Sequence, residues 1–157
     1  MAVEFVYLAD HPDHVPTVIR WWQTVWADRM GETDQSEKTL LDSLGKNELP
    51  IHVLAMVDGE AVGTAALKDQ ELADLYPDNN YWLGSVFVDE AWRGDKIASA
   101  LTEHIADLAR QRSLPHLYLQ TINLSGGLYA KLGWQALEEF ESHGERNLLM
   151  LRRFDES

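Results

Sequence analysis

Apolar positions along the first third of the chain alternate between strand-like and helix-like spacing. A short apolar run over residues 4–9 predicts a first strand. Over residues 15–26 the apolar side chains recur at helical spacing and predict a helix, with Asp13 as its N-cap and Pro16 in its first turn. Leucines that share one helical face predict a second helix over about residues 36–44.

The next part of the chain has the pattern of three consecutive strands. Residues 51–68 form two apolar runs joined by Asp58 and Gly59, a strong hairpin signal because both turn positions require a positive φ. Another apolar run, residues 81–88, predicts the third strand. Gly84 lies inside it and indicates a bulge, or a close approach of the backbone to another group, at or near that position.

The remaining elements follow in a simple order. They are a helix over about 96–111, a strand over 117–121, a brief helix that Gly133 ends, and two strands, 134–142 and 146–154, that close the chain as a hairpin.

This order of elements predicts a mixed α/β protein. The strand at 81–88, the helix after it and the strand at 117–121 form one crossover unit, so these two strands should be parallel. No internal repeat, low-complexity tract or linker interrupts the sequence. We therefore expect a single domain over residues 1–157.

Composition narrows the class of protein further. Apolar residues make up 45% and aromatic residues 10% of the 157 residues, which is typical of a globular chain. No apolar run approaches the roughly 18 residues that a bilayer requires, and no basic residue precedes Arg20, as a secretory signal would need. Because there is no cysteine, disulfides and thiolate sites are excluded. We expect a cytoplasmic protein with no membrane partner.

The charge is strongly negative and unevenly distributed. A net charge of −13 argues against a nucleic-acid partner, which would need basic residues to neutralise phosphates. Residues 58–90 hold eight acidic residues and one basic residue, a net of −7, whereas residues 91–110 are balanced. The acidic segment either serves solubility or attracts a cationic substrate.

The stretch "AWRGDKIASAL", residues 91–101, interrupts this negative charge at the start of a predicted helix. In a crossover unit, ligands bind at the carboxyl end of the strand, beside the helix N-terminus, where free N–H groups and the helix dipole favour anions. Arg93 and Lys96 add charge, and Gly94 permits a tight turn. The stretch is therefore either a phosphate-binding loop or an ordinary solvated helix start. Neither the P-loop pattern nor the Gly-x-Gly-x-x-Gly pattern occurs in the chain.

Two stretches resemble signatures of the GCN5-related N-acetyltransferase (GNAT) superfamily. "VFVDEAWRGDKIASAL" is similar to its acetyl-CoA motif, a strand followed by [QR]-x-x-G-x-[GA], with Arg93 at the first position and Ala98 at the last. Lys96 stands where a glycine is usual. "NLSGGLYAKLGW", residues 123–134, is similar to the second signature, an Asn that leads a short helix and a Tyr-x-x-x-Gly-aromatic run.

The resemblance implies a fold and a way of binding the substrate. The fold is a GNAT-like acyl-CoA N-acyltransferase sheet of about six or seven strands, mostly antiparallel, with a splayed central parallel pair and about four flanking helices. Acetyl-CoA would lie between the parallel strands as co-substrate, with no metal. The residues that would bind it are Phe87, Val88, Arg93, Gly94, Asp95, Lys96, Ile97, Ala98, Ser99 and Asn123.

The resemblance also implies how the reaction ends. Tyr129 matches the tyrosine that acts as general acid toward the leaving thiolate, and a phenol is protonated at neutral pH. The alternative is that Tyr129 only packs one face of the short helix. Asn123 either caps that helix or bonds the pantetheine arm. We assign no general base: Asp69, Glu71 and Asp74 are candidates, and a chain of water molecules would serve equally.

The leading hypothesis is therefore an acetyl-CoA-dependent N-acetyltransferase. The acidic segment favours a cationic amine as acceptor, such as an aminoglycoside, a polyamine or a lysine-like group. The alternative is an acyl-CoA-binding sensor, or a binding module of this fold that has lost its chemistry. The tryptophan-rich first helix and the closing hairpin are candidate surfaces for a homodimer.

Overall fold

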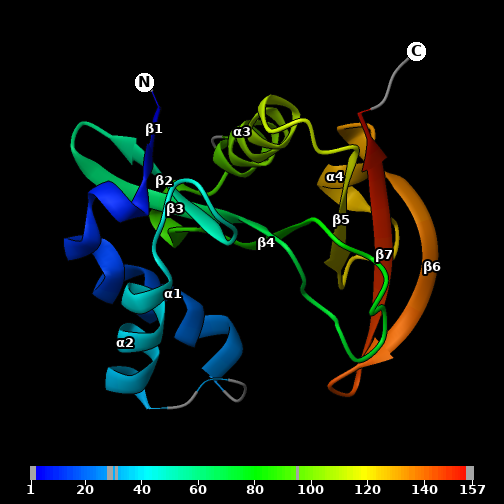
Figure 1. Cartoon of the computed structure of the whole chain (residues 1–157), viewed down its shortest axis with the longest axis horizontal. Helices are drawn as coiled ribbons and strands as arrows, with labels where there is room; N and C mark the ends of the chain where they lie inside the picture. The colour runs from blue at the N-terminus through cyan, green and yellow to red at the C-terminus, as the bar shows by residue number, and fades with distance from the viewer. Residues whose placement is uncertain (1–2, 28–29, 31, 95, 155–157) are drawn as a thin grey trace. The chain divides into compact units, whose positions relative to one another are not determined.

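The computed structural model describes residues 3–27, 30, 32–94 and 96–154 (Figure 1). Its strands form one seven-stranded sheet in the hydrogen-bonded order β1-β2-β3-β4-β5-β7-β6. Along the chain, the strands and α-helices are β1 (Glu4–Tyr7), α1 (Val15–Trp26), α2 (Thr33–Ser43), β2 (Ile51–Val57), β3 (Glu60–Lys68), β4 (Trp82–Val88), α3 (Ile97–Gln111), β5 (His116–Thr121), α4 (Gly127–Lys131), β6 (Gln135–Ser142) and β7 (Glu145–Arg153).

The chain divides into two compact units, which are described separately below. Unit 1 consists of Met1–Ala66 and Ser85–His104, and unit 2 consists of Leu67–Gly84 and Ile105–Ser157. The elements β3, β4 and α3 each contribute residues to both units. The expectation of a single domain over residues 1–157 stays a prediction.

Unit 1 contains the N-terminal strands and the first two α-helices. β1 pairs with β2 in antiparallel register, with Glu4 opposite Met56 and Tyr7 opposite Val53. All seven residues of β2 are buried, as expected for a strand covered on both faces. The core of the unit is a cluster of apolar side chains from the β1–α1 region, α2, β2 and the end of β4: Leu8, Val15, Val18, Ile19, Trp21, Leu40, Leu54, Met56 and Phe87.

The first helix starts differently from the expectation. Leu8–Asp10 and Pro12–His14 form two short 3₁₀ turns, so the first strand ends at Tyr7 instead of residue 9. The N-cap of α1 is His14, with no side-chain capping bond, and the prediction of Asp13 as N-cap was wrong. The 3₁₀ turn leads directly into the helix and leaves His14 with helical angles, φ −89° and ψ −2°. An N-cap residue normally has an extended backbone.

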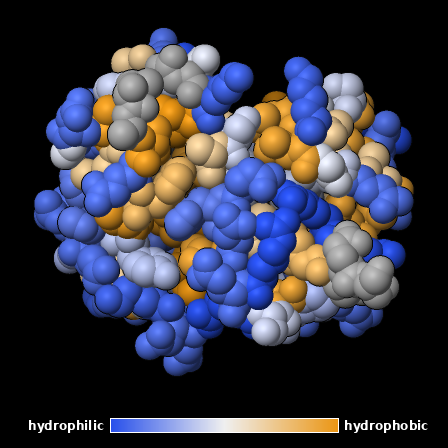
Figure 2. All heavy atoms as spheres, turned by 90° about the horizontal axis from the view of Figure 1, so that it is seen from above, coloured by the Kyte–Doolittle hydropathy of each residue, from blue (hydrophilic) through white to orange (hydrophobic). Residues whose placement is uncertain are grey.

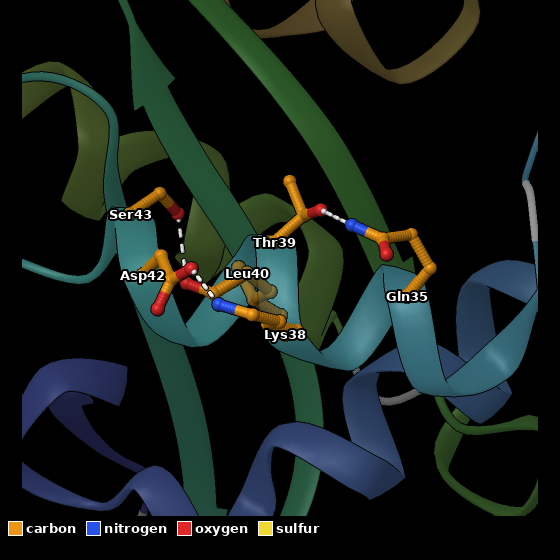
Figure 3. Close-up of polar contacts among 6 residues, drawn as sticks. All are labelled: Gln35, Lys38, Thr39, Leu40, Asp42 and Ser43. Atoms are coloured by element: carbon orange, nitrogen blue, oxygen red, sulfur yellow. Dashed lines mark hydrogen bonds and ion pairs between the residues drawn. The ribbon is translucent and has the colours of Figure 1, made fainter.

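α2 is stabilised along its surface by contacts between neighbouring turns (Figure 3). Lys38 Nζ lies 2.8 Å from Asp42 Oδ2, a pair four residues apart, and Gln35 donates to Thr39 Oγ1 at 3.3 Å. Ser43 Oγ donates to the backbone oxygen of Leu40 at 2.8 Å and closes the last turn. These local bonds help a helix that has one buried side chain, Leu40.

Unit 2 contains the parallel strand pair that the sequence predicted. Trp82 of β4 is the parallel partner of Tyr118 of β5. β5 pairs with β7, and β7 with β6, both antiparallel. Trp82, Phe140 and Leu149 form the centre of a buried cluster, against which Leu72, Tyr76 and Tyr118 pack. The mixed, mostly antiparallel sheet is thus confirmed.

Two predicted turns, at Asp58-Gly59 and at Gly133, have the positive φ values expected there. Asp58 and Gly59 have φ values of +51° and +80°, so the predicted tight hairpin joins β2 and β3. Gly133, at +94°, follows the last residue of α4's C-terminal turn and ends that helix as expected.

The loop between β3 and β4, residues 69–81, is held to β6 by one tyrosine. Tyr76 Oη donates to Glu138 Oε2 at 2.6 Å, and the Tyr76 ring meets Phe140 edge-on at 5.4 Å. Burial, followed by this bond to Glu138, raises the pKa of Tyr76 to about 12. Tyr76 therefore packs this loop against β6 within unit 2.

The surface is a mixture of hydrophilic and hydrophobic residues. Hydrophilic residues cover much of the face drawn in Figure 2, with hydrophobic side chains visible between them. In the part of the chain that the structure describes, no helix is both long and apolar enough to cross a bilayer.

Candidate active site

The predicted phosphate loop connects β4 to α3. After β4, Asp89 Oδ1 accepts a bond from the N–H of Ala91 at 3.0 Å and caps the 3₁₀ turn Glu90–Trp92. Gly94 follows with φ +92°, and no atom lies within 4 Å of the position a Cβ would take there. Asp95, an expected ligand, lies outside the described residues. The chain thus turns sharply between the strand and the helix.

Lys96 adopts the backbone conformation that the usual glycine would supply. Its φ is +65°, in the left-handed region that non-glycine residues rarely occupy. Its carbonyl accepts the first bond of α3, from the N–H of Ala100 at 3.1 Å. Lys96 therefore has a backbone conformation that glycine adopts readily, and its side chain adds a positive charge to the loop.

The first turn of α3 offers backbone donors to an anion. Ile97 is buried at 2% exposure, whereas Ala98 and Ser99 are partly exposed. The first N–H groups of an α-helix have no acceptor within the helix, and the helix dipole places partial positive charge there. α3 carries no acidic residue in its first turn. This helix start is suited to a phosphate group.

Arg93 is joined to the end of β4. Its Nε donates to the carbonyl oxygen of Val88 at 3.0 Å, and its guanidinium lies over the Phe87 ring, 5.2 Å from the ring centroid. The sequence predicted Arg93 as a source of charge for the phosphate loop. In the structure, the bond from Arg93 to Val88 also fixes the last residues of β4 relative to the loop.

The Phe87 ring also packs on α1. The ring of Trp21 stacks on it at a centroid distance of 5.7 Å, and Trp21 Nε1 donates to Asp89 Oδ2 at 3.3 Å. From the sequence, Trp21 was expected either to pack in a core or interface or to line the acceptor pocket, and its bond to Asp89 was missed. The position of Asp89 directly after the strand, where a side chain can cap the next turn, was the available signal.

β4 is irregular beside Gly84, as the sequence predicted. The positive φ, +55°, is found at Ser85. Gly84 itself marks a close approach: a Cβ there would lie 2.5 Å from Glu71 Oε1. Real Cβ contacts are not that short, so the residue at 84 must be glycine while Glu71 keeps its position.

Unit 2 contains the expected general acid, Tyr129, in the middle of α4. Burial raises the pKa of its phenol. Its ring meets Trp134 edge-on at a centroid distance of 6.3 Å, and its backbone oxygen accepts from the N–H of Trp134 at 3.0 Å. Tyr129 thus has both a packing contact and a protonated hydroxyl, as both interpretations of the sequence require.

Asn123 stabilises the turn before α4. Its Oδ1 accepts from the N–H of Ser125 at 3.1 Å and from Ser125 Oγ at 2.6 Å. The N-cap of α4 is Gly126, with φ +85° and no side-chain capping bond, so of the two roles considered for Asn123 the structure excludes the helix cap. Asn123 Oδ1, the atom that a cap would use, already accepts both bonds from Ser125. The amide nitrogen of Asn123 lies against Gly127, where a Cβ would be 2.5 Å away.

Metal-binding groups do not gather in the described parts of the chain. No set of three or more His, Asp or Glu side chains there is arranged to hold an ion. The rings of His11 and His14, which have ligand-like spacing in the sequence, lie 6.2 Å apart.

The left-handed backbone at Lys96 leads to a direct prediction. Lys96→Gly and Lys96→Ala remove the same charge, but only glycine adopts φ +65° without cost. We expect Lys96→Gly to be more stable than Lys96→Ala by about 1 kcal/mol, since a left-handed residue with a Cβ costs roughly 1–2 kcal/mol. Denaturant unfolding of both variants measures the difference. Equal stabilities would contradict this backbone conformation.

Comparison with known proteins decides the family. The model described as "Acetyltransferase (GNAT) family" matches residues 15–134, a range that includes both signatures. The chain belongs to the GNAT family. The resemblance inferred from the two motifs is thereby confirmed, and the protein is an acyltransferase. No curated protein sequence matches the chain.

Solved structures confirm the GNAT fold. A putative acetyltransferase, YncA from Salmonella typhimurium with its cofactor acetyl-CoA, is 16% identical, with a TM-score of 0.76 and coverage of 100% of this chain and 96% of that one. An aminoglycoside 6'-acetyltransferase type Ii is 18% identical, with a TM-score of 0.73 and coverage of 98% and 97%. PaiA N-acetyltransferase from Thermoplasma acidophilum, in complex with coenzyme A, is 16% identical, with a TM-score of 0.71 and coverage of 98% and 100%.

Proposed function

We propose that this GNAT protein transfers the acetyl group of acetyl-CoA to a small cationic amine. The observation that carries the proposal is the loop before α3. There, Gly94 and Lys96 both have a positive φ, and α3 begins without an acidic residue in its first turn. Such a loop presents backbone N–H groups to a phosphate. The solved structures with coenzyme A or acetyl-CoA support the choice of ligand.

Each part of acetyl-CoA has a proposed set of contacts. The pyrophosphate would bind the loop and helix start from Arg93 to Ser99, with Lys96 contributing a full positive charge. The pantetheine arm would pair with the backbone at Phe87 and Val88, as the family resemblance implies. Arg93 supports this contact because its bond to the Val88 oxygen fixes the end of β4. Asn123 is the proposed pantetheine ligand in unit 2.

The reaction follows from the chemistry of a thioester and an amine. The neutral amine attacks the carbonyl carbon, a C–N bond forms, and a backbone N–H between Val86 and Val88 stabilises the negative charge on the oxygen. The C–S bond then breaks, and the thiolate takes the proton of the Tyr129 hydroxyl. The proton that the attacking nitrogen loses as it becomes an amide returns through water to Tyr129 and restores its hydroxyl. Burial, which raises the pKa of Tyr129, keeps that proton in place at neutral pH.

The charge distribution favours a cationic acceptor. Residues 58–90 carry a net charge of −7, and Asp69, Asp74 and Asp78 in the β3–β4 loop are exposed. Negative charge near a binding site raises the local concentration of cations and their association rate. A cytoplasmic location and a homodimer stay predictions.

Two measurements test the proposal. Thermal unfolding with acetyl-CoA tests binding, and we expect stabilisation of about 2.7 kcal/mol at a ligand concentration 100 times Kd. A thiol-release assay with an aminoglycoside, a polyamine and a lysine-like amine tests turnover, with an alcohol as control. No stabilisation at millimolar acetyl-CoA would overturn the proposal. Binding without thiol release on any amine would favour the acyl-CoA sensor instead.

A further inference from the structure

Trp21 joins α1 to the end of β4 by a hydrogen bond and a ring contact, all within unit 1. Its side chain is buried at 6% exposure, and its Nε1 donates to Asp89 Oδ2 at 3.3 Å. Its ring stacks on Phe87 at a centroid distance of 5.7 Å, with the two ring planes 21° apart. A tryptophan that uses both its ring and its N–H group defines the position of its neighbours more closely than an aliphatic core residue does.

Asp89 is the residue at which β4 ends and the loop before α3 begins. Its N–H donates to the oxygen of Val62 in β3 at 2.8 Å, and its own backbone oxygen accepts from the N–H of Trp92 at 2.8 Å. In its side chain, Oδ1 accepts from the N–H of Ala91 and Oδ2 accepts from Trp21. These hydrogen bonds tie Asp89 to β3, to α1 and to the 3₁₀ turn that follows it.

The Phe87 ring is also contacted by the loop itself. The guanidinium of Arg93 lies 5.2 Å from the centroid of the ring on which Trp21 stacks, and Arg93 Nε donates to the Val88 oxygen at 3.0 Å. The residues of the loop that have a positive φ follow Arg93 in the chain. Trp21 and Arg93 therefore meet the same side chain, one from α1 and the other from the loop.

We infer that Trp21 is a positioning residue for acetyl-CoA, acting through Asp89 and Phe87 on the strand end and the loop that bind it. This inference rests on the proposed function, in which the pantetheine arm pairs with the backbone at the end of β4 and the pyrophosphate binds the loop. A loop already held in its bound conformation loses less conformational entropy on binding, so the affinity is higher. Left-handed residues in such a loop persist only where the surrounding structure holds them.

The bond from Trp21 also orients an acidic side chain beside the proposed phosphate site. Asp89 directly precedes the loop, and a carboxylate that turned toward a bound pyrophosphate would repel it. Trp21 and Ala91 each donate to one of its oxygens, which directs the carboxylate toward α1 and the 3₁₀ turn. Removing the Trp21 donor releases Oδ2. We therefore expect this loss to weaken the binding of acetyl-CoA.

Trp21→Phe removes the indole N–H group and keeps an aromatic ring against Phe87. We expect the dissociation constant for coenzyme A, measured by titration calorimetry at a temperature where the variant is folded, to rise by about 5-fold. In a thiol-release assay the KM for acetyl-CoA should rise by a similar factor, with kcat and the KM for the amine close to wild type. A residue that only stabilises the fold would lower the unfolding midpoint and leave these constants unchanged.

Two results for Trp21→Phe would overturn the inference. One is a dissociation constant for coenzyme A that equals the wild-type value. The other is an increase confined to the KM for the amine, which would place Trp21 at the acceptor instead.

Trp22→Phe is the matched control, because it makes the same change at the next residue of α1. Trp22 is partly buried, its ring lies 5.7 Å from the His52 ring, and its Nε1 has no hydrogen-bond acceptor among the described residues. The substitution thus removes a similar volume from the helix without removing a bond to the loop. The affinity for coenzyme A should stay at the wild-type value. If Trp22→Phe weakens binding as much as Trp21→Phe does, a loss of packing in α1 is the cause and the inference is wrong.

Asp89→Asn removes the same bond from its acceptor side. Asparagine keeps the size of the side chain and can still cap the 3₁₀ turn through its oxygen, so its amide nitrogen becomes a second donor facing Trp21. In this background Trp21→Phe should change the dissociation constant by less than about 2-fold, because the bond is already absent. An equal increase in both backgrounds would show that Trp21 does not act through Asp89 and would overturn the inference.

Failure of the proposed function has a different signature. If neither coenzyme A nor acetyl-CoA binds the wild-type protein, the proposed function is wrong and the inference falls with it. If the wild type binds both and the variants bind equally well, the inference alone is wrong.

Discussion

Replacing Tyr129 with phenylalanine is expected to lower kcat by about 100-fold or more, the usual contribution of a well-placed acid. Phenylalanine keeps the ring that meets Trp134 at 6.3 Å and removes only the hydroxyl. Stabilisation by acetyl-CoA should therefore remain close to that of the wild type. A thiol-release assay at saturating amine, together with thermal unfolding, measures both quantities.

The pH dependence gives this prediction a second readout. A general acid works only while it is protonated, and burial raises the pKa of Tyr129 above the usual value of about 10 for a phenol. The rate should therefore show no loss from this group up to about pH 10 and should fall only above it. If the pKa were lowered, the loss would begin at a more neutral pH.

Tyr7→Phe is a suitable control, because it removes a hydroxyl from a partly buried tyrosine for which no role in the reaction is proposed. It should keep wild-type kcat. If Tyr129→Phe also keeps it, Tyr129 serves only to pack α4. A variant that loses acetyl-CoA stabilisation but not kcat would likewise contradict the role as acid.

Trp82→Ala is expected to cost about 3–5 kcal/mol of unfolding free energy, the range for deleting a large buried aromatic side chain. Trp82 is fully buried, lies 5.4 Å from the Tyr118 ring, and donates from Nε1 to the Asn79 oxygen at 2.6 Å. Trp82 of β4 is the parallel partner of Tyr118 of β5. Removing its side chain therefore affects both the core of unit 2 and the pairing of these two strands.

Denaturant unfolding measures this cost, with Leu75→Ala as control. Leu75 is a large apolar residue of the β3–β4 loop that is 47% exposed, so its truncation should change stability by only about 0.5 kcal/mol. Trp82→Phe should lie between the two, because it keeps an aromatic ring and leaves the Asn79 oxygen without its donor. A cost below about 1 kcal/mol for Trp82→Ala would contradict the buried position described here.

Features that depend on local chain chemistry could be predicted from the sequence. The Asp58-Gly59 turn and the end of α4 at Gly133 follow from residue types that tolerate a positive φ. The helix over 97–111 follows from apolar spacing, and the parallel pair from the crossover rule. The loop before α3 was found by its place after a strand and by its resemblance to a family motif.

Features that depend on tertiary contacts could not be predicted from the sequence. Nothing near Gly84 in the sequence shows that the carboxylate of Glu71 will lie on it, 13 residues away in the chain. Arg93 looks like a phosphate ligand in the sequence, and its bond to Val88 depends on how the loop turns back on the strand. Asp13 was expected to cap α1, and a cap of α4 was one of two roles considered for Asn123, whereas the preceding turns decide where α1 and α4 begin.

The last strand of the sheet bears on how copies of this protein can associate. β6 stands at the end of the strand order, is mostly exposed, and has an irregular register between Ala136 and Glu138. An open edge invites a second molecule to extend the ladder, and bulges and charges prevent this. On this strand Glu141 is an exposed charge, and Glu139 is already paired with Arg146 of β7, Oε1 to Nε at 3.0 Å. The bulge thus disfavours a continuous sheet across two molecules through β6, and we expect the predicted homodimer, if it forms, to use another surface.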